Sequence, residues 1–169
     1  MQNKSKEAET ACRIVIADDQ AFIRKGLRMF LSENPQFDIV GEAENGRLLV
    51  NLVKETSPDL ALVDLSMPEM SGIEAIREIR KTNSVMRILM LTMHVEEHMF
   101  SQTLDAGADG YILKEKMHEE LFPALYALLQ SKLYISPSML SEIHSSHLKA
   151  FITDALSREF WRIAPNHFK

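Results

Sequence analysis

Polar side chains stand at the ends of short apolar runs in this sequence. Asp18 and Asp19 follow the first such run, Asp64 ends another, Thr92 ends a third, and Lys114 follows the last. A short apolar run bounded by turn signals is typical of a buried strand in a parallel sheet. Because the carboxyl ends of parallel strands meet at one sheet edge, we expect these side chains to gather there.

Three carboxylates at one edge would repel one another and raise a pKa unless a cation lay among them. Oxygen ligands without histidine or cysteine nearby favour a hard ion, Mg²⁺ before Zn²⁺. Lys114 adds a point charge and Thr92 a hydroxyl donor. These groups around one carboxylate form a receptor for a phosphoryl group, so the pattern predicts that Asp64 is a nucleophile that forms an aspartyl phosphate.

Helical patterns alternate with the apolar runs. Predicted strands cover residues 13–17, 37–41, 60–63, 87–91 and 110–113, and predicted helices cover about 20–32, 45–57, 72–81, 95–104 and 118–130. Pro123 lies inside the last helix, where we expect it to bend or delay that helix. The alternation predicts an α/β fold with a five-stranded parallel sheet and helices on both faces.

Composition limits the class of protein. The 169 residues suffice for one domain with a sizeable core, and 46% hydrophobic and 25% charged residues are typical of a globular protein. A net charge of −5 argues against broad binding to nucleic acid or anionic membranes. A single cysteine, Cys12, excludes an internal disulfide, and the polar residues 1–11 read as a frayed lead-in rather than a signal peptide. We expect a cytoplasmic protein without a membrane span.

Five motifs in this order resemble the receiver domain of a bacterial two-component response regulator, over about residues 12–130. They are Asp18-Asp19, Asp64 with Met67-Pro68 and Gly72, Thr92, Gly110-Tyr111-Ile112-Leu113 and Lys114. The resemblance implies a flavodoxin-like (βα)5 fold and a signalling role rather than a conventional enzyme. In that family the aspartate at the position of Asp64 accepts a phosphoryl group from the phosphohistidine of a sensor histidine kinase.

The resemblance also implies a role for each neighbouring residue. Asp19, Asp64 and the Ser66 backbone carbonyl would hold Mg²⁺ directly, with Asp18 acting through water, and Lys114 would grip the phosphoryl oxygens. After phosphorylation, Thr92 would move toward the phosphate and Tyr111 would swing inward. That switch would remodel the face formed by the fourth helix, fifth strand and fifth helix. We also expect that phosphorylation allows the chain to form a homodimer.

Several residues point to the NarL/FixJ subfamily. Glu115 follows the lysine where many receivers have proline, and 134–137 resemble that subfamily's linker. Met93, after Thr92, is bulkier than the residue in many receivers and should hinder access to the phosphate. We expect residues 131–155 to be a linker with marginal helical content.

Residues 156–169 resemble only the opening of the LuxR-type helix-turn-helix domain that this subfamily carries. We therefore expect a regulator that is truncated or altered in frame, or a piece cut just inside the effector domain. Specific DNA binding by this chain is not expected, although full-length members of the subfamily bind promoters.

Other readings remain open. A haloacid-dehalogenase phosphatase would want a second aspartate where Ser66 stands, and a flavodoxin-like cofactor binder would want hydroxyl and glycine donors in place of Asp18-Asp19. A pseudo-receiver would act as a protein–protein module without phosphorylation. Taken alone, Asp64 could simply end a strand, Lys114 could be a surface lysine, and His94 and His98 a solvated helix face rather than a metal site.

Overall fold

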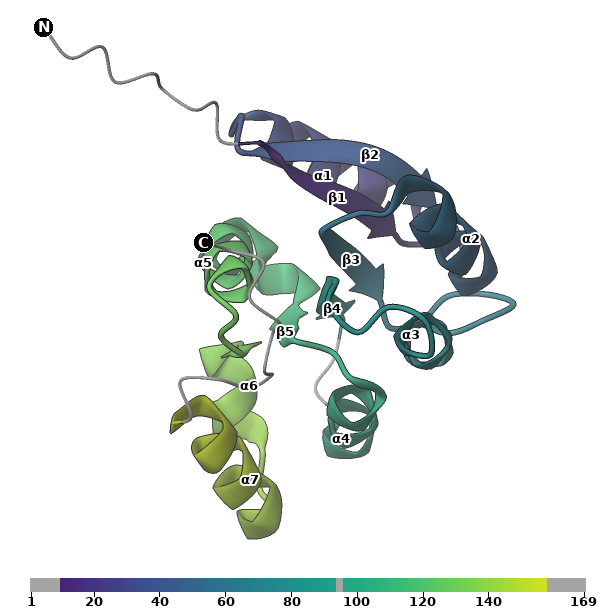
Figure 1. Ribbon diagram of the computed structural model, residues 1–169. Coiled ribbons are helices and arrows are strands. Elements are labelled where there is room, and N and C mark those ends of the chain that lie inside the picture. Colours follow the sequence, from purple (N-terminus) through teal and green to yellow (C-terminus); the bar gives the residue numbers. More distant parts are fainter. Residues whose placement is uncertain (1–9, 94–95, 158–169) are drawn as a thin grey trace, which may run out of the picture.

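A six-stranded parallel sheet forms the centre of the computed structural model, which describes residues 10–93 and 96–157 (Figure 1). The strands are β1 (Cys12–Ala17), β2 (Phe37–Ala43), β3 (Leu60–Asp64), β4 (Arg87–Thr92), β5 (Gly110–Leu113) and β6 (Tyr134–Ile135), in the order β2-β1-β3-β4-β5-β6. The helices are α1 (Ala21–Ser32), α2 (Gly46–Thr56), α3 (Gly72–Arg80), α4 (Glu97–Ala106), the short 3₁₀ turn η1 (Lys114–Lys116), α5 (Met117–Leu129), α6 (Pro137–Glu142) and α7 (Ser146–Ser157).

Apolar side chains on the two faces of the sheet form two separate cores. Successive residues of a strand point to opposite faces, so Ile14 and Ile16 face one core while Val15 and Ala17 face the other. The first core is completed by α1 and α5, and the second by α2, α3 and α4. The predicted parallel α/β architecture with helices on both faces is therefore confirmed.

The sheet has one strand more than the five that the sequence predicts. Tyr134 pairs with Gly110 and Ile135 with Tyr111, in parallel with β5. Two residues are too few to produce the alternation that reveals a strand in a sequence. At the other edge, the pairing of β2 with β1 shifts register between Ile14 and Val15, which marks a bulge.

Two helices lie in the segment that the sequence predicts to be a linker. They are α6 and α7, and Figure 1 shows them beyond β5, on the side of α4. Leu156 and Ser157 are the last residues of α7, while residues 158–169 lie outside the described part of the chain. The resemblance of residues 156–169 to the start of a DNA-binding domain therefore stays a prediction.

Local signals explain where several helices begin or end. The Asn45 side chain caps α2 by accepting from the Leu48 N–H, and Ser71 forms a capping box with Glu74 at the start of α3. Helix α4 starts two residues later than predicted and ends at Gly107, whose φ of 102° suits glycine. Helix α5 runs from Met117 to Leu129 with Pro123 inside it. No described helix is long and apolar enough to cross a membrane.

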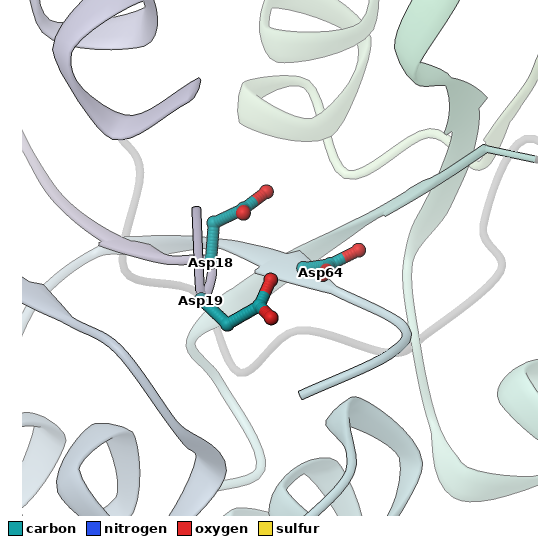
Figure 2. A group of neighbouring side chains, drawn as sticks. All are labelled: Asp18, Asp19 and Asp64. Atoms are coloured by element: carbon teal, nitrogen blue, oxygen red, sulfur yellow. The ribbon is translucent and has the colours of Figure 1, made fainter. Parts of the chain in front are cut away.

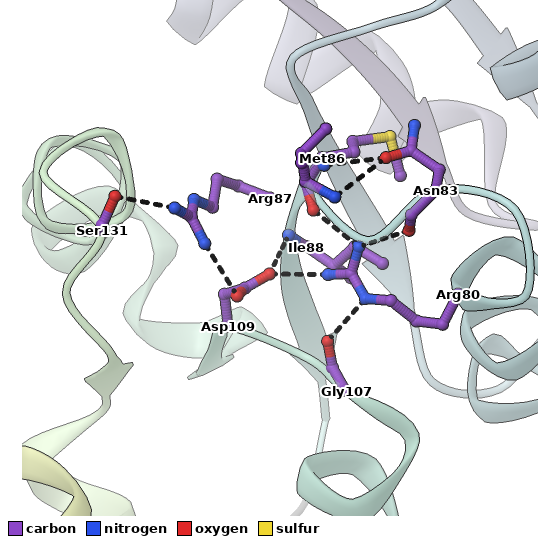
Figure 3. A network of polar contacts seen from close by, with 9 residues as sticks. Arg80, Asn83, Met86, Arg87, Ile88, Gly107, Asp109 and Ser131 are labelled. Carbon is purple, nitrogen blue, oxygen red and sulfur yellow. Dashed lines mark hydrogen bonds and ion pairs between the residues drawn. The ribbon is translucent and has the colours of Figure 1, made fainter. Parts of the chain in front are cut away.

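A buried ionic network joins the amino-terminal ends of β4 and β5 to the segment after α5 (Figure 3). The Asp109 carboxylate lies 2.7 Å from an Arg80 guanidinium nitrogen and 3.3 Å from one of Arg87, and it also accepts from the Ile88 N–H. The other terminal guanidinium nitrogen of Arg87 donates a hydrogen bond to the Ser131 hydroxyl at 2.7 Å. One buried carboxylate thus holds together α3, β4, the α4–β5 turn and the start of the C-terminal segment.

Replacing Asp109 with alanine should destabilise the fold strongly, because two largely buried guanidinium groups lose their counter-charge. Removing one partner of a buried ion pair costs roughly 3–5 kcal/mol. Chemical denaturation followed by circular dichroism should show a large drop in the unfolding midpoint for Asp109→Ala. The matched variant Asp105→Ala, at an exposed carboxylate near the end of α4, should leave the midpoint nearly unchanged; equal effects would contradict the prediction.

Candidate functional site

Three carboxylates gather at the carboxyl edge of the sheet, as the strand ends predict. Asp18 and Asp19 follow β1, and Asp64 is the last residue of β3. Figure 2 shows the three side chains at adjoining strand ends, and oxygen atoms from all three lie within 4.8 Å of one another. Among the residues that the structure describes, this is the cluster of acidic, histidine or cysteine side chains that could hold a metal ion. Asp18 and Asp64 are buried and Asp19 is exposed, so the cluster opens to solvent on one side.

Lys114 completes the cluster from the end of β5. Its Nζ lies 2.6 Å from an Asp18 carboxylate oxygen and 2.9 Å from one of Asp64, and the side chain is buried. Burial lowers the pKa of Lys114, but its contacts with the two carboxylates outweigh burial and leave the pKa raised. The ammonium group therefore remains charged and partly neutralises the two buried carboxylates.

Asp64 is 3% exposed, and burial raises its pKa above the ordinary value of 3.8. Lys114 opposes this shift, the Asp18 charge adds to it, and a hydrogen bond from the Ser66 backbone N–H lowers it. A carboxylate whose charge is costly in this setting gains from any additional cation placed beside it. The site is thus electrostatically prepared for a positive ion.

The turn after Asp64 is fixed by close backbone contacts. A Cβ at Gly72 would come within 2.2 Å of the Asp64 carbonyl oxygen, so only glycine lets α3 begin this close to the strand end. Before it, Glu69 has a positive φ of 63°, and the Met70 N–H donates to the Pro68 carbonyl at 2.7 Å across it. The Met67-Pro68 and Gly72 motif therefore shapes the loop that carries Ser66 past the carboxylate.

Asp18 is held in place from three directions. Its own N–H donates to the Ala43 carbonyl, and the Gln20 N–H donates to its carboxylate at 2.8 Å. A guanidinium N–H of Arg24 donates to its backbone carbonyl at 2.7 Å. With Lys114 on the other oxygen, this carboxylate is rigidly oriented, while Asp19 is left facing solvent.

Thr92 and Tyr111 form a second part of the site. Thr92 ends β4, and its side chain lies near the Tyr111 hydroxyl, for which no hydrogen-bond partner is found among the described residues. Tyr111 is fully buried, and burial raises its pKa to about 12, with the Thr92 contact opposing that shift. Its ring packs edge-on against Phe100 of α4, with the ring centroids 5.1 Å apart. The structure therefore has Tyr111 inside the core, with its hydroxyl close to the strand end at Thr92.

A cleft of about 250 Å³ leads from solvent to this cluster. Its walls come from Asp19, Gln20, Asp64, Leu65, Ser66, Thr92, Met93, Glu96 and Lys114. All the predicted site residues except Asp18 and Tyr111 line it, and Asp18 contacts the lining residue Lys114. Met93 lines the cleft and is 54% exposed.

Three lining residues were not predicted from the sequence: Gln20, Leu65 and Glu96. Gln20 stands directly after the aspartate pair, so its position was a usable signal. Glu96 comes from the loop between β4 and α4, where the sequence shows no strand end. Of the two histidines considered above, His98 is exposed and contacts Gln102, while His94 lies outside the described residues.

Replacing Asp64 with asparagine should stabilise the metal-free protein at neutral pH. A raised pKa in the folded state means that folding opposes ionisation of Asp64, so stability falls as pH rises from 3.8 to that pKa. Asparagine does not ionise. The gain in stability of Asp64→Asn should therefore be complete at pH values above the raised pKa of Asp64 and should vanish below pH 3.8. Thermal melts with a chelator from pH 3 to 8, with Asp38→Asn as an exposed control, would check this; a pH-independent difference would contradict it.

A family model for the response regulator receiver domain matches residues 14–126. The transcriptional regulatory protein YdfI of Bacillus subtilis is 38% identical over 131 residues, which cover 78% of this chain and 61% of that protein. The nitrate/nitrite response regulator NarL of Escherichia coli is 33% identical over 126 residues, covering 75% of this chain and 58% of that protein. The chain thus spans about 60% of the length of each of these relatives.

Solved structures agree with this assignment. A LuxR-family two-component response regulator from Aurantimonas superposes with a TM-score of 0.75 at 35% identity, covering 79% of this chain and 96% of that one. The isolated REC domain of RcsB from Salmonella enterica, with the phosphomimetic BeF3⁻, gives 0.74 at 28% identity, covering 80% and 100%. The chain belongs to the response regulator receiver domain family and is a receiver of the NarL/LuxR type.

Proposed function

We propose that Asp64 accepts a phosphoryl group from the phosphohistidine of a sensor histidine kinase, with Mg²⁺, and that the phosphorylated receiver changes conformation to control an output. The observation that carries this proposal is the contact of 2.9 Å between Lys114 Nζ and a buried Asp64 oxygen, beside two more carboxylates at the end of a solvent cleft. Receivers are signalling domains that interact with histidine kinases and often dimerise.

The acidic cluster fits a hard divalent cation, because every nearby donor is an oxygen atom. Asp19, Asp64 and the Ser66 backbone carbonyl would hold Mg²⁺ directly, and Asp18 would act through water. When bound, Mg²⁺ would offset the negative charge of the carboxylates and of the incoming phosphoryl oxygens. The raised pKa of Asp64 supports this assignment, since a second cation stabilises its charged form.

In the transfer step, one Asp64 carboxylate oxygen forms a bond to phosphorus while the phosphorus–nitrogen bond of the phosphohistidine breaks. The departing imidazole nitrogen keeps the bonding electron pair and takes a proton from solvent. Lys114, already beside Asp64, would neutralise one phosphoryl oxygen, and the Thr92 hydroxyl would donate to another. Attack of water on phosphorus would later return the Asp64 carboxylate and inorganic phosphate.

The output would begin at Thr92. When its hydroxyl turns toward the phosphoryl group, Thr92 would move relative to the nearby Tyr111, and the buried ring would adjust against Phe100 of α4. We propose that residues 12–130 form the receiver domain. We also propose that the phosphorylated receiver can form a homodimer. The acidic cluster and Lys114 together argue against a pseudo-receiver, which would need neither.

Phosphorylation of Asp64 can be tested directly by intact mass. Incubation with acetyl phosphate and Mg²⁺ should add one phosphoryl group to the wild-type chain, because the cluster neutralises the charge that builds up at Asp64. Asp64→Asn should gain none, and the wild type should gain none with a chelator. Asp38→Asn, the same change at an exposed carboxylate of β2, should gain the group normally. A phosphoryl group gained by Asp64→Asn would mean that another residue is the acceptor.

Shortening Met93 should speed entry to the cleft. Met93→Ala removes bulk from its lining, so both phosphorylation by acetyl phosphate and loss of phosphate by hydrolysis should be faster than in the wild type. Quenched samples followed by intact mass would give both rates. Met29→Ala, which trims an exposed methionine on α1, should leave them unchanged. Unchanged rates in Met93→Ala would mean that this side chain does not restrict access.

A further inference from the structure

Asp19 is the exposed member of the acidic cluster, and its backbone is held on both sides. The Asp18 carbonyl, which belongs to the peptide unit before Asp19, accepts a hydrogen bond from Arg24 Nη1 at 2.7 Å. The Gln20 N–H, which belongs to the peptide unit after Asp19, donates to the Asp18 carboxylate at 2.8 Å. Peptide units are planar, so the orientations of these two units set φ and ψ of Asp19 and thereby the direction of its side chain.

The Arg24 guanidinium that holds one of these units has a second acceptor. Its Nε lies 3.2 Å from a Glu42 carboxylate oxygen, and its side chain is only 16% exposed. A guanidinium is planar and has its donors at fixed angles, so two acceptors at once determine its orientation. The group that binds the Asp18 carbonyl is therefore itself held in one position.

Glu42 is in turn braced by a second arginine of α1. Its other carboxylate oxygen accepts a hydrogen bond from Arg28 Nε at 2.7 Å. Arg24 and Arg28 are four residues apart, which places them on the same face of the helix. Each arginine thus contacts a different oxygen of one carboxylate, and a chain of polar contacts runs from Arg28 through Glu42 and Arg24 to the Asp18 carbonyl.

The bulge at the pairing of β2 with β1 places Glu42 on this face of the sheet. The pairing skips Val40, so Glu42 lies opposite Ile16, which faces the core that α1 completes. In an unbroken register Glu42 would lie opposite Ala17, which faces the other core, because a shift of one residue moves each side chain to the opposite face. Bulges beside functional sites are known to re-aim a side chain in this way.

We propose that Arg24 is a positioning residue for the divalent cation site: it holds the Asp18 carbonyl and so fixes the direction of the Asp19 carboxylate, while Glu42 orients Arg24. The inference rests on the proposed function only through its Mg²⁺ site. Residues that orient a metal ligand from outside the coordination shell typically change metal affinity by roughly 10–100-fold when they are replaced.

The charge of Arg24 and its geometry would act on a bound cation in opposite directions. A positive charge near the site repels Mg²⁺, so loss of the charge alone would tighten binding. Loss of the hydrogen bond to the Asp18 carbonyl would free the backbone of Asp19 and weaken binding. A mere brace between α1 and β2 would change stability and leave Mg²⁺ affinity as it is. The direction of the change in Mg²⁺ affinity therefore identifies the role of Arg24.

The test is a titration of the full chain with Mg²⁺, without a phosphoryl donor, followed by amide shifts in nuclear magnetic resonance spectra. Arg24→Gln should raise the Kd for Mg²⁺ roughly tenfold, and Glu42→Gln should raise it by a smaller factor. Arg24→Lys keeps the charge, so a raised Kd in that variant reports geometry alone. Lys25→Gln removes a positive charge from an exposed position of the same helix and should not raise the Kd.

Unchanged or tighter Mg²⁺ binding in Arg24→Gln would overturn the inference. If circular dichroism shows that Arg24→Gln does not fold, Arg24→Lys and Glu42→Gln decide by the same criterion. The proposed function is checked separately, by intact mass of the wild type after addition of acetyl phosphate. Weakened Mg²⁺ binding in the variants without a phosphoryl gain in the wild type would refute the proposed function and leave this inference standing. A wild-type chain that does not bind Mg²⁺ would overturn both.

Discussion

The functional edge of this sheet depends on two buried carboxylates that share one ammonium group. Asp18 and Asp64 would repel each other strongly in a setting with little water, and Lys114 lies within 2.9 Å of both. One positive charge beside two buried negative charges, with Asp19 close by, leaves the cluster with a net negative charge. That net charge, rather than any single side chain, favours an added cation at this site.

Backbone geometry maintains this arrangement. Gly72 allows α3 to start against the carbonyl of Asp64, and the turn at Glu69 carries the loop back toward the cleft. On the other side, Gln20 and Arg24 hold Asp18 through its carboxylate and its carbonyl. The charged groups therefore keep their positions although their mutual electrostatics would separate two of them.

Much of this could be predicted from the sequence, for identifiable reasons. Apolar runs marked the strands at the site, and the rule that strand ends share an edge brought Asp18, Asp64, Thr92 and Lys114 together. Strand β6 was missed because two residues carry no periodicity, and α6 and α7 were expected only as marginal helical content of a linker. Glu96 was missed because its place in the cleft comes from how the start of α4 packs, which no local pattern reveals. The roles of the site residues in chemistry stay predictions.

The two outer strands of the sheet also bear on how the protein meets other chains. At one edge β6 offers only two residues, and at the other β2 is interrupted by a bulge and carries the exposed carboxylates of Asp38 and Glu42. Short, kinked and charged edges are poor templates for an added strand, and natural proteins use them against aggregation. Partners of this domain are thereby steered away from backbone pairing and toward side chains on its helices, where recognition can be selective and reversible.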